Sequence, residues 1–124
     1  MPTPDPDDGP GSALVRQLDA LASNDDPVPD AGIETAYDFA SPANRRRTGG
    51  YDRFARTLHS DRYAPLVDHL EAVAGPVGRT WNGATCRVTV TGTDGRTVTY
   101  ALRLSPAADG PFRNCWQTDA VVVA

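Results

Sequence analysis

The sequence predicts a single α+β domain in which three N-terminal helices pack on a four-stranded antiparallel sheet. Apolar residues recur at helical spacing as far as Leu58 and alternate with polar residues, as in strands, from Arg79 onward. Clusters of Pro, Gly, Asn and Asp separate these short periodic segments, as turns do. A chain of 124 residues is long enough to form one domain with a substantial core.

The amino-acid composition argues against two classes of binding partner, nucleic acids and membranes. The formal net charge is −4, all 12 basic residues are arginine, and the acids other than Glu34 and Glu71 are aspartate. This acidic, lysine-free bias is typical of GC-rich genomes and common in salt-adapted archaea. A nucleic-acid binder normally has a strongly basic face, so we expect no nucleic-acid partner. Without an apolar run of about 20 residues or a basic, apolar leader, we expect a cytoplasmic protein and no membrane partner.

The chain opens with an acidic segment rich in Pro and Gly. We expect residues 1–11 to be a disordered tail and residues 12–124 to form the domain. Ser12 is a candidate N-cap for the first helix. The apolar stripe of that helix consists of Leu14, Val15, Leu18, Leu21 and Ala22.

The second and third helices are expected within residues 30–59. Asp30 is the candidate cap of the second helix, and Ser41-Pro42 should end it, because proline disfavours an α conformation in the preceding residue. The third helix should begin after Gly50. The apolar faces of these two helices consist of Ile33, Ala36, Tyr37 and Ala40, and of Tyr51, Phe54, Ala55 and Leu58.

The connection between these helices is a candidate anion site. A hydroxyl, flexible glycines and guanidinium groups come just before a helix N-terminus, where anions commonly bind. The residues are Arg45, Arg46, Arg47, Thr48, Gly49 and Gly50. The alternative is a solvated basic loop whose arginines pair with acids such as Asp38 or Asp52.

Residues 66–76 have helical spacing but lie between prolines and glycines, so periodicity leaves helix and strand both open. Beyond them, Asn82-Gly83 predicts a tight turn. A two-residue turn at Asp94-Gly95 would place the apolar rows of the flanking strands on opposite faces. A three-residue loop, residues 93–95, pairs Val90 with Val98 and puts both rows on one face, so we expect this register and a G1 bulge at Gly95.

The last strand is expected over residues 112–123. Phe112, Trp116, Ala120 and Val122 would share one of its faces. The strand at 97–104 would then separate Cys86 from Cys115 by roughly 9–10 Å, because neighbouring strands lie about 4.8 Å apart. That exceeds the reach of a disulfide, so we expect two free thiols.

Three short motifs resemble the signature of a known family. They are Phe39-Ala40-Ser41-Pro42, Arg53-Phe54 and Tyr63-Ala64-Pro65-Leu66, followed by the ending GPFRNCWQTDAVVV. Over residues 12–123 the chain resembles domain of unknown function 4864, within the nuclear transport factor 2-like superfamily. The resemblance implies a cone-shaped roll with a curved sheet around a pocket, and favours a strand from about His69. Because that family has no established activity, the resemblance implies no chemistry.

Enzymes of the superfamily, such as ketosteroid isomerase, use an acid or base in the cone together with hydrogen-bond donors. The residues of these types here are Asp38, His59, Asp68, His69 and Glu71, with Tyr37, Tyr63 and Tyr100 as donors. Their spacing identifies no catalytic pair, so the catalytic residues stay unassigned. His59 is interpreted as a helix C-cap and His69 as an edge or surface histidine.

Aromatic residues complete the candidates. Tyr37, Tyr100 and Trp116 are candidate ligand-binding residues, and Trp81 or Trp116 could floor a pocket, although either could be a core or rim aromatic. Arg53 or Arg56 could pair with Glu34. The histidines and cysteines lack metal-ligand spacing, so we expect no metal or cofactor.

Three functions from different classes remain open. The first is a non-catalytic module that binds a small molecule or anion. The second is a protein-interaction module, a homodimer through the sheet face. The third is a small isomerase, dehydratase or hydrolase. A roomy pocket without an acid or base would favour the first, a large flat apolar patch on the sheet the second, and an acid or base among apolar side chains the third.

Overall fold

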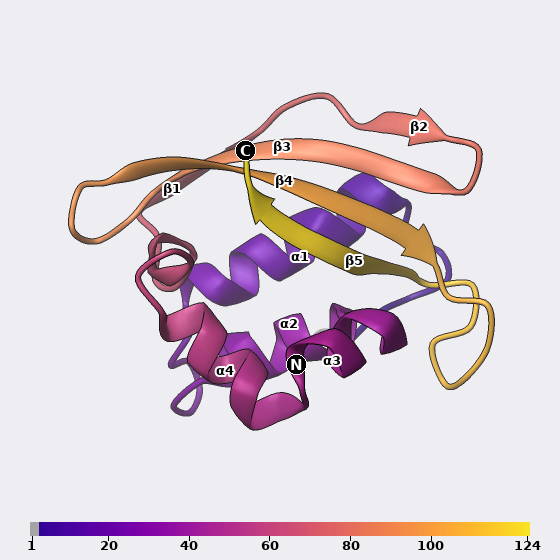
Figure 1. Cartoon of the computed structure of the whole chain (residues 1–124), viewed down its shortest axis with the longest axis horizontal. Helices are drawn as coiled ribbons and strands as arrows, with labels where there is room; N and C mark the ends of the chain where they lie inside the picture. The colour runs from indigo at the N-terminus through magenta and orange to yellow at the C-terminus, as the bar shows by residue number, and fades with distance from the viewer. Residues whose placement is uncertain (1–2) are drawn as a thin grey trace.

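The computed structural model describes residues 3–124 and confirms the α+β class. Four helices lie on one side of a five-stranded antiparallel sheet, in which the main strand order is β1-β3-β4-β5 and β2 pairs with β3 (Figure 1). The sheet is open and does not close into a barrel. The described structure therefore has one helix and one strand more than the predicted three helices and four strands.

Helix α1 spans Pro10–Ala22 and runs beneath the sheet, next to α2, Ala31–Phe39 (Figure 1). The predicted N-cap at Ser12 is wrong. Gly9 caps α1 and Pro10 occupies its first turn, where its missing N–H is no loss. The helix thus includes Pro10 and Gly11, the last two residues of the predicted tail. Residues 1–2 of that tail lie outside the described part of the chain.

The expected connection at residues 45–48 is instead helical. Helix α3 spans Pro42–Thr48 and α4 spans Tyr51–His59. Ser41-Pro42 ends α2 but also starts α3, since the Ser41 hydroxyl accepts a hydrogen bond from the Asn44 N–H at 3.2 Å. Gly49 and Gly50, with φ of 88° and 96°, form the corner between α3 and α4.

The segment left open between helix and strand contains two strands. A 3₁₀ turn at Ala64–Leu66 (η1) precedes β1, Glu71–Ala74, and β2, Gly78–Thr80. β2 pairs with β3 so that Thr80 lies opposite Gly83. The turn residues are therefore Trp81-Asn82, one position earlier than the predicted Asn82-Gly83.

The predicted register of the central hairpin is confirmed. β3, Gly83–Thr91, pairs with β4, Thr97–Pro106, and Val90 lies opposite Val98. Gly95 has φ of 83°, and its N–H donates to the Gly92 carbonyl at 3.0 Å. The large apolar side chains of this hairpin accordingly reach one face of the sheet.

The last strand is shorter and less regular than predicted. β5 spans Trp116–Val123, and a register shift places Thr118 opposite Leu104 and Ala120 opposite Arg103. The predicted common face of Phe112, Trp116, Ala120 and Val122 is therefore wrong, because the shift breaks the alternation of side chains. The free edge of β5 is met by the end of α2, where the Ser41 N–H donates to the Thr118 carbonyl at 2.9 Å.

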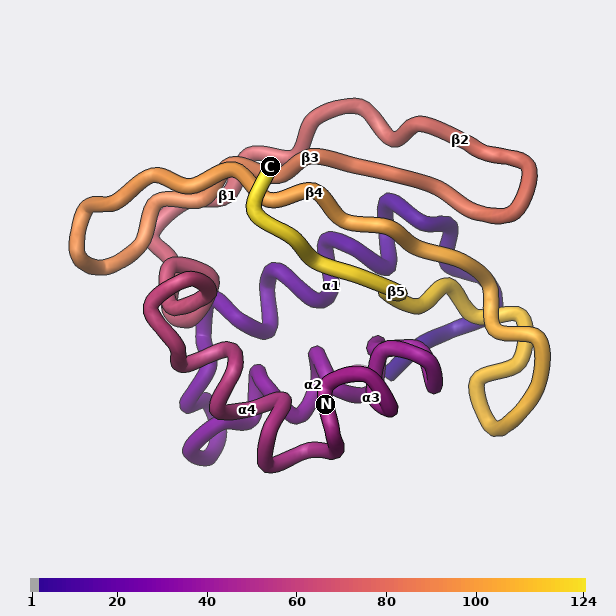
Figure 2. The backbone as a smooth tube through the Cα atoms, in the orientation of Figure 1, coloured from indigo at the N-terminus to yellow at the C-terminus, as the bar shows by residue number. Residues whose placement is uncertain are grey.

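The core lies between the sheet and the helices, and in the view of Figure 2 the trace of α1 lies between the strands and α2. Its buried members are Leu14, Leu18, Leu21, Ile33, Ala36, Leu58, Leu66, Cys86, Val88, Val90, Tyr100, Leu102 and Leu104. Val15, predicted to lie on the α1 stripe, is exposed. Cys86 and Cys115 are buried and free, as predicted. In residues 3–124 no helix has the length and apolar character needed to span a bilayer.

Candidate functional site

A cavity of about 500 Å³ lies between the helices and the inner face of the sheet. Its size is within the range of small-molecule sites, ~300–1,000 Å³. Elements from both ends of the chain form its wall. The lining residues are Leu14, Gln17, Leu18, Leu21, Ala36, Ala40, Asn44, Arg47, Thr48, Phe54, Thr57, Leu58, Tyr63, Leu66, Leu102, Arg103, Thr118, Ala120, Val121 and Val122.

The buried polar groups of the wall bind one another. Thr118 Oγ1 donates to Gln17 Oε1 at 2.8 Å, and Gln17 Nε2 donates to the Ala13 carbonyl at 3.2 Å. Asn44 Nδ2 donates to the Thr118 carbonyl at 3.1 Å. These bonds join α1 and α3 to β5. They also provide hydrogen-bond partners for side chains that would otherwise be costly to bury. A ligand therefore does not need to form hydrogen bonds with the deep wall.

Arg47 and Thr48 bring polar groups to the wall from α3. The Arg47 side chain is exposed, and its Nη2 donates to the backbone carbonyl of Asp119 on β5. It thus reaches from α3 to β5. The Thr48 hydroxyl donates within α3, to the carbonyls of Asn44 at 3.0 Å and Arg45 at 3.2 Å. Of the nine predicted ligand-binding residues, these two line the cavity.

Arg45 has a structural role. Its Nε donates to the carbonyls of Tyr37 and Ala40, each at 3.1 Å, and its Nη2 to that of Asp38 at 3.3 Å. The guanidinium also lies 4.4 Å from the centre of the Tyr37 ring. Carbonyls at the end of a helix have no intrahelical partner, so Arg45 closes α2. It binds backbone carbonyls where the alternative interpretation expected the carboxylates of Asp38 or Asp52.

The remaining members of the predicted anion site do not converge. Arg46 is exposed on α3, and Gly49 and Gly50 shape the α3–α4 corner. The idea of a flexible loop gathering three guanidinium groups at the start of α4 is therefore wrong in its geometry, because residues 45–48 are helical and their side chains diverge. Glu34, expected to pair with Arg53 or Arg56, forms an ion pair with neither in the described structure.

The candidate aromatic residues lie outside the cavity wall. Tyr37 packs edge-on against Tyr51 and Phe54, with ring centres 5.3 and 5.1 Å apart. Tyr100 is fully buried, donates to the Arg62 carbonyl at 2.7 Å, and has its pKa raised to about 12 by burial. Tyr100 is therefore a core residue, and Tyr37 packs α2 against α4.

The tryptophans likewise do not floor a pocket. Arg79 stacks over Trp116, 5.2 Å from its ring centre. Trp81, at the β2–β3 turn, is 95% exposed and contacts no core residue of the described cluster. Trp81 is therefore an exposed turn residue, which is neither the pocket floor nor the core position considered for it.

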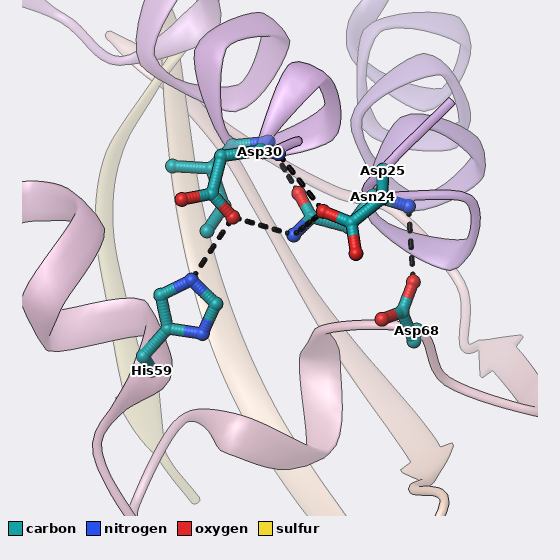
Figure 3. A network of polar contacts seen from close by, with 6 residues as sticks. Asn24, Asp25, Asp30, His59 and Asp68 are labelled. Carbon is teal, nitrogen blue, oxygen red and sulfur yellow. Dashed lines mark hydrogen bonds and ion pairs between the residues drawn. The ribbon is translucent and has the colours of Figure 1, made fainter. Parts of the chain in front are cut away.

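Several candidate acids and bases gather instead around Asn24 (Figure 3). Asn24 is 1% exposed. Its backbone N–H donates to Asp68 Oδ1 at 3.1 Å and its Nδ2 donates to Asp30 Oδ1 at 2.9 Å. Its Oδ1 accepts from the Ile33 N–H at 2.9 Å. We call this group of contacts the Asn24 corner; it joins the end of α1 to the start of α2.

His59 ends α4, as its predicted capping position requires, and its Nε2 lies 3.0 Å from Asp30 Oδ1. The hydrogen bond from Asn24, followed by the interaction with His59, holds the pKa of Asp30 below its ordinary value. His69 is buried, with Nδ1 2.8 Å from the Leu66 carbonyl, so its interpretation as a surface histidine is wrong. None of these residues lines the cavity.

The two cysteines likewise do not line the cavity. Burial raises the pKa of Cys86 and of Cys115, which keeps both in the less reactive thiol form. Within residues 3–124, no three His, Cys, Asp or Glu side chains gather as ligands for a metal ion.

Sequence reasoning missed the polar wall residues Gln17, Asn44 and Thr118. One signal was present for Gln17, which occupies the same helical stripe as Leu14, Leu18 and Leu21. A polar residue on an apolar stripe must find a buried partner. Its partner Thr118 lies 101 residues away, so no local pattern connects the two.

Comparison with protein-family models, with curated proteins and with solved structures found no match for this chain. The resemblance to domain of unknown function 4864 therefore stays a prediction.

Proposed function

We propose that this domain binds a small, largely apolar molecule in the cavity and does not transform it chemically. One observation carries the proposal. The cavity is large enough for a ligand, and its described lining contains no Asp, Glu, His or Cys that could act as acid, base or nucleophile. Apolar walls with a few fixed polar groups are typical of binding sites for small molecules.

The hydroxyl groups of the wall do not supply the missing chemistry. Tyr63 donates its phenolic proton to the Val121 carbonyl at 3.0 Å, and Thr118 donates to Gln17. A hydroxyl becomes a nucleophile when a neighbouring base activates it, and the partners here are a carbonyl and an amide. This arrangement supports binding over the isomerase, dehydratase or hydrolase alternative.

The outer face of the sheet gives less support to the homodimer alternative. Its central positions are mostly polar: Thr85, Arg87, Thr89, Thr97, Thr99, Ala101 and Arg103. Thr89 and Thr99 pair through their hydroxyls at 2.9 Å. The large exposed apolar residues within the strands are Val73 on β1 and Val122 and Val123 on β5, at opposite ends of the strand order, whereas Leu70, Val77 and Trp81 lie in the segments that flank β1 and β2. A stable dimer interface usually has a contiguous apolar centre.

The test is calorimetric titration of the protein with 1-octanol, an uncharged apolar probe. We expect saturable binding by the wild type. Ala36→Leu adds carbon atoms at a residue that lines the cavity, so it should weaken binding about tenfold or more. Ala101→Leu makes the same change on the outer face and should leave binding unchanged. Absence of saturable binding by the wild type, or equal effects of the two variants, would overturn the proposal.

A further inference from the structure

We propose that the ligand of this cavity is an amphipathic anion whose charged head group binds the guanidinium of Arg47, with its apolar body inside. This inference rests on the proposed function, because it names the class of molecule that the cavity takes. It goes beyond that function by assigning a charge to the ligand and a place to that charge.

The first argument is the state of Arg47. A guanidinium has five N–H donors. The one side-chain hydrogen bond of Arg47 in the described structure goes to a neutral acceptor, the Asp119 carbonyl. The three ion pairs among described residues involve Arg16, His59 and Arg96, so Arg47 has no carboxylate partner there. Its charge and most of its donors remain open to a ligand.

The second argument is the sign of charge around the cavity. The charged residues of its described lining are Arg47 and Arg103, and no carboxylate lines it. Arg103 lies between the inward-facing Leu102 and Leu104 on β4, so alternation directs its side chain to the outer face. The carboxylate of Asp119 is bound by the Ser105 hydroxyl at 2.6 Å. Arg47 is therefore the cation that a ligand in this cavity meets.

The third argument is where a ligand charge could be accommodated. The buried wall groups Gln17, Asn44 and Thr118 already satisfy one another. A charge placed among them and the surrounding leucines would lose its hydration without an opposite charge nearby, which is strongly unfavourable. The exposed guanidinium of Arg47 offers that opposite charge together with charge-assisted hydrogen bonds. One end of the ligand should therefore be anionic and the remainder apolar.

The test compares octanoate with 1-octanol, which have the same chain and differ in head-group charge. In calorimetric titrations of the wild type, octanoate should bind more tightly than octanol. Added NaCl should weaken the binding of octanoate and leave that of octanol nearly unchanged, because salt screens an exposed charge pair.

Variants locate the charge. Arg47→Gln should weaken octanoate binding about fivefold and leave octanol binding unchanged, since an exposed charged contact contributes modestly. Arg47→Lys should retain much of the preference for octanoate. Arg46→Gln is the matched control, because Arg46 is the neighbouring exposed arginine of α3 and does not line the cavity. It should change neither probe.

The outcomes separate the two proposals. Saturable binding of octanol with no preference for octanoate, and no salt dependence, would refute the anionic ligand and leave the apolar site in place. Equal loss of octanoate binding in Arg46→Gln and Arg47→Gln would also refute it. If neither probe binds the wild type, the proposed function fails, and the anionic ligand fails with it.

Discussion

Gly32 and Ala36 lie one turn apart on α2, yet the space available to a side chain differs between the two positions. Gly32 packs against α1 at the Asn24 corner, where a Cβ atom would lie 2.2 Å from the Ala20 carbonyl oxygen. Ala36 lines a cavity of about 500 Å³. One helix therefore has no room for a methyl group at one turn and room for a ligand at the next.

The polar groups of the two regions differ in the same way. At the Asn24 corner, backbone and side-chain groups of the α1–α2 junction are bonded to one another, and the Gly32 N–H donates to the Asn24 carbonyl at 2.8 Å. In the cavity, Arg47 forms no ion pair with any residue of the described range 3–124 and lies next to unfilled space. Close packing and satisfied polar groups stabilise a fold, whereas an open apolar cavity reduces stability and is typical of a binding site.

The largest effect should come from adding a methyl group at Gly32, where the corner has no space for one. Gly32→Ala should destabilise the fold by about 3 kcal/mol or more, because the clash is with backbone and the two helices must separate. Urea unfolding followed by circular dichroism measures this. Gly11→Ala in α1 is the control, since the nearest atom lies 3.9 Å away, and it should be neutral or stabilise by about 0.5–1 kcal/mol. Equal stabilities of the two variants would contradict the tight packing at Gly32.

Removing the central side chain of the corner should have a somewhat smaller effect. Asn24→Ala should destabilise by about 2–3 kcal/mol, because it leaves the buried Ile33 N–H without an acceptor. The same unfolding measurement applies. Asn82→Ala at the exposed β2–β3 turn should change stability by less than about 0.5 kcal/mol. If Asn24→Ala also changed the free energy of unfolding by less than about 0.5 kcal/mol, the Asn24 corner would not be needed for stability.

A larger side chain in the cavity, unlike one at the Asn24 corner, should not reduce the stability of the fold. Ala36→Leu should keep or raise stability, by up to about 1 kcal/mol, because its new carbons enter open space. Ala13→Leu, at an α1 residue that is 1% exposed and does not line the cavity, should destabilise by about 1–3 kcal/mol. Thermal unfolding of both variants tests this. A loss in Ala36→Leu equal to that in Ala13→Leu would mean that the cavity is closed.

The smallest effect concerns pH at the rim of the corner. The pKa of Asp30 lies below its ordinary value of 3.8, first through the Asn24 hydrogen bond and then through His59. Its stabilising contribution is therefore complete above about pH 4 and is lost as pH falls through the lower, folded pKa. Asp30 is partly exposed, so we expect less than about 1 kcal/mol. Urea unfolding between pH 2 and 6 should show a shallower acid-side slope for Asp30→Asn. An unchanged slope would contradict the assignment.

The sequence predicted most of the fold where local physics decides structure. The β3–β4 register followed from Gly95 and from the need to bury both apolar rows together. The α3 helix was missed because Ser41-Pro42 was read as a stop, although proline at a first helical turn is equally a start. The register shift in β5 left no pattern in residues 112–123 that distinguishes it from regular alternation.

The candidate site was less predictable, because it depends on contacts between distant segments. Arg47 and Thr48 were identified from their residue types and their position before a helix N-terminus, together with Arg45 and Arg46. Arg45 instead closes α2, and Arg46 does not line the cavity. The direction of each arginine depends on its position around α3. The pairing of Gln17 with Thr118 depends on the whole topology. Neither can be read from spacing.

The bridge between the end of α2 and β5 also bears on how the domain folds. Ala40 pairs with Thr118, and Thr118 in turn bonds to Gln17 across 101 residues. Contacts between residues so far apart form slowly during folding, because closing a long loop costs conformational entropy. In addition, the ribosome synthesises β5 after the other described elements. During synthesis, the helices and the β3–β4 hairpin can therefore form while one side of the core is still uncovered. That exposed apolar surface is prone to aggregation until β5 docks.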